Sequence, residues 1–188
     1  MRHGIARTIS IVAHPFVTAL VLTAVLASSS GTAALRTAAA VAVLFVLPVA
    51  ILTVRQVRRG TWSTVDASEP RDRKILFAVG AGGLFALLAY FARTQPGSAF
   101  VHGTFGVLVM VAVCAAITPW VKVSLHMAAA ALAAAVLLGR GHPLGWLLAA
   151  ILPVLAWSRL ELRRHQLREV ILGTALGACT GAAIALFG

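Results

Sequence analysis

The sequence predicts an all-α fold, a polytopic membrane helix bundle with six or seven transmembrane helices in a single integral-membrane domain. Two observations support this prediction. Of the 188 residues, 60% are hydrophobic and only 11% are charged, whereas soluble domains average about 45–50% and about 25%. The apolar residues also gather into runs of the length that a spanning helix needs, about 20 residues. This composition excludes an ordinary soluble enzyme, a disordered chain and a disulfide-linked scaffold.

Seven apolar runs are expected to form the spanning helices. They cover residues 8–27, 33–54, 75–92, 99–118, 121–138, 144–157 and 170–187. The first run resembles a signal peptide, but we expect a retained helix because the pair His14-Pro15 is foreign to a signal core. The sixth run is short, so its helix is expected to extend at both ends. The last run carries Gly173, Gly177 and Gly181 at four-residue spacing, a pattern that indicates close helix packing.

The distribution of charge predicts which ends of the helices face the cytoplasm. Short loops join most runs, so neighbouring helices are expected to be antiparallel. With the faces alternating along the chain, all five Asp and Glu and all but three of the 16 Lys and Arg lie on one face. The exceptions are Arg36, Arg93 and Arg140. The positive-inside rule places the basic face in the cytoplasm of a bacterial-type inner or plasma membrane. The net charge of +11 is therefore attributed to anionic lipid headgroups rather than to nucleic acid.

The residue types that bind metals do not form a set in this sequence. Cys114 and Cys179 both lie inside apolar runs and are interpreted as small core residues, without a disulfide. The sequence shows no carboxylate cluster and no Cys/His set with the spacing of metal ligands. No metal and no other cofactor is expected.

Three clusters of ionisable residues fall on the basic face at the membrane boundary, where such residues are functional candidates. The first covers residues 66–74, before the third run, and contains Arg71 and Arg73. The second opens the fifth run with Lys122, Ser124 and His126. Lys122 and His126 are four residues apart and share a helix face. Backbone N–H groups near Ser124, at a helix start, are suited to an anion.

The third cluster precedes the last run and consists of Ser158, Arg159, His165 and Glu169. Glu169 follows His165 by one helical turn, so its carboxylate can accept a hydrogen bond from one imidazole nitrogen and leave the other as a nucleophile. Arg159 offers a planar fork of donors that suits phosphate oxygens. The remaining histidines are interpreted as structural: His14 as a polar kink, His102 and His142 toward the opposite face, and His3 in a tail.

The order of these residues resembles the type-2 phosphatidic acid phosphatase superfamily, whose motifs are K-x6-R-P, P-S-G-H and S-R-x5-H-x3-D. The third motif matches at Ser158, Arg159 and His165, with Glu169 in place of the usual Asp. It is the most specific part of the resemblance, which covers about residues 66–180.

The first two motifs of that superfamily match less fully. Ser124 and His126 match the second motif, whose Pro and Gly are replaced by Val and Leu. Arg71 and Arg73 stand in for the first motif.

The resemblance implies a role for each of these residues. His165 would be the nucleophile on phosphorus and would form a phosphohistidine, oriented by Glu169. His126 would protonate the leaving group. The residues that would hold the phosphoryl oxygens are Arg159, Arg71, Arg73, Lys122 and Ser124. Members of the superfamily need no metal.

The implied function is that of a metal-independent phosphatase for a lipid-linked phosphate or diphosphate, with an isoprenoid or a glycerolipid as the lipid. Its partners would be the phosphorylated lipid substrate and a bilayer that contains anionic lipids. The alternative is a catalytically degenerate member of the superfamily that acts as a lipid-binding, scaffold or transport protein. An intramembrane prenyltransferase is excluded, because the sequence lacks the paired Asp-rich motifs that such an enzyme needs to hold magnesium.

Overall fold

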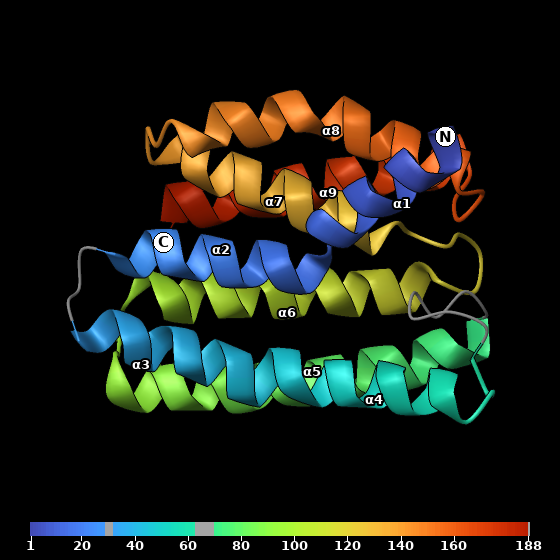
Figure 1. Cartoon of the computed structure of the whole chain (residues 1–188). Helices are drawn as coiled ribbons and strands as arrows, with labels where there is room; N and C mark the ends of the chain where they lie inside the picture. Colours follow the sequence, from blue (N-terminus) through green and yellow to red (C-terminus); the bar gives the residue numbers. More distant parts are fainter. Residues whose placement is uncertain (29–31, 63–69, 188) are drawn as a thin grey trace. The chain divides into compact units, whose positions relative to one another are not determined.

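The computed structural model describes residues 1–28, 32–62 and 70–187, and every regular element in these ranges is a helix (Figure 1). The all-α prediction is confirmed for the described residues. The chain divides into two compact units: unit 1 combines Met1–Leu22 with Val121–Gly188, and unit 2 is Thr23–Trp120. The prediction of a single domain stays a prediction. Asp66 and Glu69, in the first predicted cluster, lie outside the described residues.

Unit 1 is built around one buried helix. Its helices are α1 (Arg2–Val12), the first part of α2 (Pro15–Ala27), α7 (Leu125–Gly139), α8 (Leu144–Glu161) and α9 (Leu167–Phe187). Most residues of α7 are buried, and α7 packs against both α8 and α9, while α1 packs against α8 (Figure 1). The many alanines of α7 permit this, because a helix with small side chains can be approached closely on several faces.

The glycines of α9 lie on its contact face with α7. A Cβ added to Gly173 would lie 2.5 Å from the Ser124 carbonyl oxygen, and one added to Gly181 would lie 2.5 Å from that of Leu132. Gly177 meets the Ala128 carbonyl in the same way. Since the residue numbers of the contacting positions rise together on both helices, α7 and α9 run parallel. The close packing predicted from the glycine spacing is confirmed.

The first predicted span is broken at the His-Pro pair. The helices α1 and α2 meet there at a bend of 43°. Pro15 has no N–H to donate and suits the first position of a helix. The Nδ1 of His14 accepts a hydrogen bond from the Phe16 N–H at 3.3 Å, which caps the start of α2. The kink expected from the sequence is present and has this capping as its cause.

Unit 2 contains three long helical segments. The first is continuous from α3 (Thr32–Val41) through the π-helical segment η2 (Ala42–Val46) to α4 (Leu47–Arg58), and α5 (Pro70–Thr94) and α6 (Ala99–Ile117) follow. α5 packs against η2, α4 and α6. Gly83 makes the contact with η2 possible, because an added Cβ would lie 2.5 Å from the Leu44 carbonyl oxygen.

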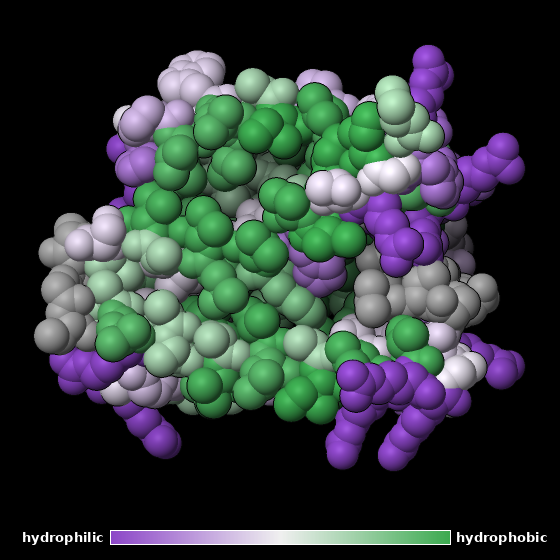
Figure 2. All heavy atoms as spheres, in the orientation of Figure 1, coloured by the Kyte–Doolittle hydropathy of each residue, from purple (hydrophilic) through white to green (hydrophobic). Residues whose placement is uncertain are grey.

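Five helices in the described chain are long and apolar enough to cross a membrane, or six when α1 and α2 count as one broken span. Large apolar side chains are exposed along the helices, and Figure 2 shows them covering the flanks on the face in view. These features are those of an integral membrane protein.

The helices of the second, third and last predicted spans extend beyond the predicted bounds, and the fifth and sixth spans also differ from the helices observed. The run 121–138 becomes α7, which starts only at Leu125; its 15 residues reach about 22 Å at about 1.5 Å per residue, less than a bilayer core of about 30 Å. The segment before it stays extended because the Ser124 N–H is bonded to the Glu169 carbonyl at 3.2 Å. The run 144–157 extends to Glu161 at its C-terminal end only, since Pro143 precedes its first residue.

Candidate functional site

A tight turn between α8 and α9 presents the third motif. The backbone of Arg163 adopts a left-handed φ of 51° directly after the helix end. The Arg163 N–H donates to the Leu160 carbonyl at 2.9 Å, and the Arg164 N–H donates to that of Arg159 at 3.2 Å. This pair of bonds closes α8 in the manner usually served by glycine. A left-handed residue other than glycine is strained, and such strain gathers at functional sites.

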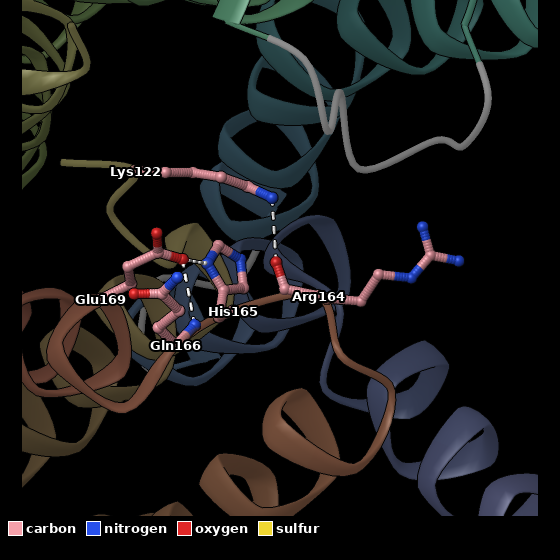
Figure 3. Close-up of polar contacts among 5 residues, drawn as sticks. All are labelled: Lys122, Arg164, His165, Gln166 and Glu169. Carbon is pink, nitrogen blue, oxygen red and sulfur yellow. Dashed lines mark hydrogen bonds and ion pairs between the residues drawn. The ribbon is translucent and has the colours of Figure 1, made fainter. Parts of the chain in front are cut away.

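This turn brings the side chain of His165 close to that of Glu169, which lies near the start of α9. Their side chains meet with 2.8 Å between His165 Nδ1 and Glu169 Oε2 (Figure 3). Both residues are buried, with 9% and 8% exposed. The same oxygen accepts the backbone N–H of Gln166 at 3.2 Å, which is half of a capping box at the start of α9. A carboxylate beside Nδ1 favours the tautomer that carries the proton there, so that the lone pair of the neutral ring is on Nε2.

Ser158 and Arg159, at the end of α8, are held by α1. Ser158 is fully buried and its Oγ donates to the Ala6 carbonyl at 2.7 Å. Arg159 is 1% exposed, and its Nη1 donates to the Ser10 hydroxyl. Burial of a guanidinium is costly unless its donors are used, and α1 provides one of the acceptors.

The second motif meets the third at the start of α7 and α9. The backbone bond from Ser124 to Glu169 joins the two segments. Lys122 Nζ donates to the Arg164 carbonyl at 2.9 Å, while the Arg164 side chain points away from the cluster (Figure 3). Ser124 is fully buried, and its Oγ has no hydrogen-bond partner among the described residues. The start of α7 therefore holds a buried hydroxyl with hydrogen-bonding capacity to spare.

His126 lies in the first turn of α7 and is 5% exposed. Its ring stands edge-on to that of His14, with 5.1 Å between the ring centroids and 81° between their planes. From the sequence, His14 was predicted only to be a structural kink, and Ser10 was not predicted to belong to the site. One signal was available: Ala6, Ser10 and His14 follow one another at four-residue spacing in the N-terminal segment.

The stand-ins for the first motif lie in unit 2, at the start of α5. Arg71 is exposed. Arg73 is 2% exposed, and its guanidinium carbon lies 5.8 Å from the ring centroid of Phe77. Lys74 borders an apolar groove of about 480 Å³ between α5 and α6. Unit 1 thus brings together the second and third motifs, while a joint site with Arg71 and Arg73 stays a prediction.

Within residues 1–28, 32–62 and 70–187, no three His, Cys, Asp or Glu side chains are grouped as metal ligands would be. Both cysteines are free thiols, Cys114 buried and Cys179 exposed. The groups that unit 1 offers for chemistry are imidazole, carboxylate, guanidinium, ammonium and hydroxyl.

Comparisons of this chain with protein-family models, with curated proteins and with solved structures found no match.

Proposed function

We propose that this protein is a metal-independent phosphatase that hydrolyses a lipid-linked phosphate or diphosphate through a phosphohistidine intermediate. The observation that carries the proposal is the buried hydrogen bond of 2.8 Å between His165 Nδ1 and Glu169 Oε2. A nucleophilic imidazole needs this arrangement, because the carboxylate orients the ring and stabilises the positive charge that develops on it. The order of motif residues along the chain points to the same chemistry.

The reaction would proceed in two steps. In the first, the Nε2 lone pair of His165 attacks the terminal phosphorus, and the bond from that phosphorus to the leaving oxygen breaks; this oxygen belongs to the lipid alcohol in a monophosphate and to the lipid phosphate in a diphosphate. That oxygen keeps the electron pair and takes a proton from protonated His126. In the second, a water oxygen attacks phosphorus, the P–N bond breaks, and its electron pair returns to Nε2 while the water proton passes to His126. Inorganic phosphate leaves and both histidines return to their starting states.

The phosphoryl oxygens would be bound by groups of unit 1 near the turn between α8 and α9. Arg159 supplies a planar fork of N–H donors. Ser124 supplies a buried hydroxyl that an incoming oxygen would satisfy, next to the first N–H groups of α7. We include Lys122 as a further cationic contact, while the roles of Arg71 and Arg73 stay predictions from the resemblance.

The lipid nature of the substrate and the side of the membrane are part of the proposal. Apolar flanks on the helices suit a substrate whose chain stays in the bilayer while its phosphate lies at headgroup level. Isoprenoid and glycerolipid phosphates both meet this requirement. The excess of Lys and Arg on the face that carries the motifs supports a site on the cytoplasmic side, where anionic lipids would surround it.

One set of contacts favours the alternative, a lipid-binding, scaffold or transport protein. Ser158, Arg159 and Lys122 each make a hydrogen bond that joins separate segments of unit 1. A member of the superfamily without catalytic activity could retain these residues because they hold the helices together. The alternative gives no reason for the His165–Glu169 pair beyond the cap on α9.

The test is phosphate release by the full-length protein, purified in detergent, with EDTA present. The substrates are phosphatidate, prenyl mono- and diphosphates and phosphatidylglycerophosphate. We expect release from at least one of them and no detectable turnover by His165→Ala, because the nucleophile is gone. His102→Ala is the control, since His102 is exposed on α6 in unit 2, and it should retain full activity.

Two results would contradict the proposal. Turnover by His165→Ala at a rate near that of the wild type would remove the phosphohistidine route. Absence of release from every substrate by the wild-type protein would favour the lipid-binding or scaffold alternative.

A further inference from the structure

We infer that α1 and His14, which lies between α1 and α2, belong to the site: Ser10 positions the guanidinium of Arg159, and His14 positions the ring of His126. This inference rests on the proposed function and extends it to a helix that contains none of the three motifs. Both are positioning residues, because each acts through a motif residue.

The contacts follow one stripe of the N-terminal segment. Ala6, Ser10 and His14 are spaced by four residues, close to one helical turn. Ala6 accepts a hydrogen bond from Ser158, and Ser10 accepts one from Arg159. The break after Val12 then turns the chain, and the His14 ring reaches His126. Each residue of the stripe therefore contacts a different motif residue, on α8 or on α7.

The choice of a serine opposite Arg159 has a chemical consequence. A hydroxyl oxygen accepts one N–H of the guanidinium and fixes the plane of its fork. A carboxylate at the same place would fix it too, but would neutralise the positive charge. The Ser10 hydroxyl orients the guanidinium without itself neutralising the positive charge, which suits a phosphate dianion as ligand. Ser10 is itself only 8% exposed, so the bond is shielded from water.

His14 is held in one orientation by its own backbone. Nδ1 accepts the Phe16 N–H, which in a neutral ring places the proton on Nε2. Pro15 restricts the backbone next to it. The fixed ring stands edge-on against His126 and limits the orientations open to that imidazole, which must face the leaving oxygen to protonate it.

Ser10 is tested with a pair of hydroxyl deletions on the same helix. Ser10→Ala removes the acceptor of Arg159, whereas Thr8→Ala removes an exposed hydroxyl that bonds only to the Gly4 carbonyl of its own helix. We expect kcat/KM for the lipid phosphate to fall roughly 10- to 100-fold in Ser10→Ala, as for other hydrogen bonds to charged groups, and to stay within about twofold in Thr8→Ala. Ser10→Thr retains a hydroxyl and should restore most of the activity.

His14 is tested with a pair of capping histidines. His142 precedes Pro143, and its Nδ1 accepts the Leu144 N–H at 3.3 Å, as His14 does for Phe16. Asparagine retains a capping acceptor at either place.

The two substrates differ in how much their leaving group needs a proton. An alkyl phosphate needs a proton on its leaving oxygen, whereas a nitrophenyl phosphate releases a nitrophenolate that is stable without one. His14→Asn should lower kcat/KM for a lipid alkyl phosphate roughly 10-fold or more and leave kcat/KM for a nitrophenyl phosphate with an alkyl tail nearly unchanged, because kcat/KM reports the first step, in which the leaving oxygen departs. His142→Asn should leave the ratio of the two rates as in the wild type.

The outcomes separate this inference from the proposed function. An active wild type, an inactive His165→Ala, and effects of Ser10→Ala and His14→Asn no larger than those of their controls would overturn the role of α1 and leave the phosphatase proposal in place. A wild-type protein that releases no phosphate would overturn both. Unfolding temperatures of all variants, measured in the same detergent, separate lost positioning from lost folding, and the two pairs test the inference independently.

Discussion

Glu169 combines a structural and a chemical task in one carboxylate oxygen. Its Oε2 accepts the Gln166 N–H, which caps α9, and contacts His165 Nδ1. The cap ties the carboxylate to the start of a helix, where the helix dipole favours negative charge. The side chain that orients the proposed nucleophile is therefore itself held by the backbone.

The charge of Glu169 is testable separately from its shape. Glu169→Gln retains an oxygen that accepts both hydrogen bonds but removes the negative charge, so we expect folding to persist and turnover to fall roughly 10²- to 10⁴-fold, less than in His165→Ala. Glu161→Gln is the control, because it removes the same charge near the same turn at the end of α8. Glu169→Asp keeps the charge and should stay active. Steady-state phosphate release measures all three, and equal losses in the two glutamine variants would contradict this role.

At the scale of helices, the glycines of α9 set the distance between the second and third motifs. The Gly173 contact with the Ser124 carbonyl lies one turn from the bond between Ser124 and Glu169. Any displacement of α9 away from α7 would therefore also move Glu169 relative to the start of α7. The glycine face of α9 and the turn that carries His165 are therefore expected to move together.

An alanine scan at two glycines tests this packing. Gly177→Ala places a Cβ against the Ala128 carbonyl, a backbone atom that cannot move alone, and should lower the free energy of unfolding by about 1–3 kcal/mol. Gly82→Ala, on α5, adds a Cβ with nothing within 4 Å and should be neutral or stabilising by up to about 1 kcal/mol, from helix propensity alone. Unfolding in mixed detergent measures the difference. If Gly177→Ala proves as stable as Gly82→Ala, the close approach of α7 and α9 is wrong.

At the scale of the whole molecule, the two ends of the helices are expected to face opposite sides of the membrane. In unit 1 the starts of α7 and α9 and the end of α8 meet at the motif turn, as the bonds from Ser124 and Lys122 show. The opposite end of that unit carries the turn from α7 to α8, where Arg140 ends α7 and Gly141 takes a positive φ of 66°. Each unit-1 helix end can therefore be assigned to one of two sides.

Cysteine labelling tests which side faces the cytoplasm. Arg168→Cys marks the motif end of unit 1 and Arg140→Cys the other end; both positions are exposed, and each change removes one arginine. In a background without Cys114 and Cys179, a membrane-impermeant thiol reagent applied to intact cells should label Arg140→Cys and spare Arg168→Cys. Permeabilised cells, in which both should react, provide the control. The reverse pattern in intact cells would put the site on the outer face.

The helical class follows from the amino-acid sequence, because the apolar runs have the length of membrane-spanning helices. The spacing of Gly173, Gly177 and Gly181 likewise indicated a close-packing face on α9, because glycine spacing is a local property of one helix, but it did not indicate that α7 is the partner. The pairing of His165 with Glu169 was predicted from their spacing of four residues, although in the structure His165 lies in the turn before α9 and not on the helix itself. These features depend on neighbours within a turn or two along the chain.

The contacts of α1 with Ser158 and Arg159 are seen only in the tertiary structure. Ser10 and Arg159 are 149 residues apart, and no local pattern records which distant side chain a serine will meet. The late start of α7 has the same origin, because the Ser124 N–H bonds to a carbonyl of α9 rather than within its own segment. Contacts between segments far apart in sequence depend on how helices pack, and hydrophobic periodicity specifies that a face is buried without specifying its partner.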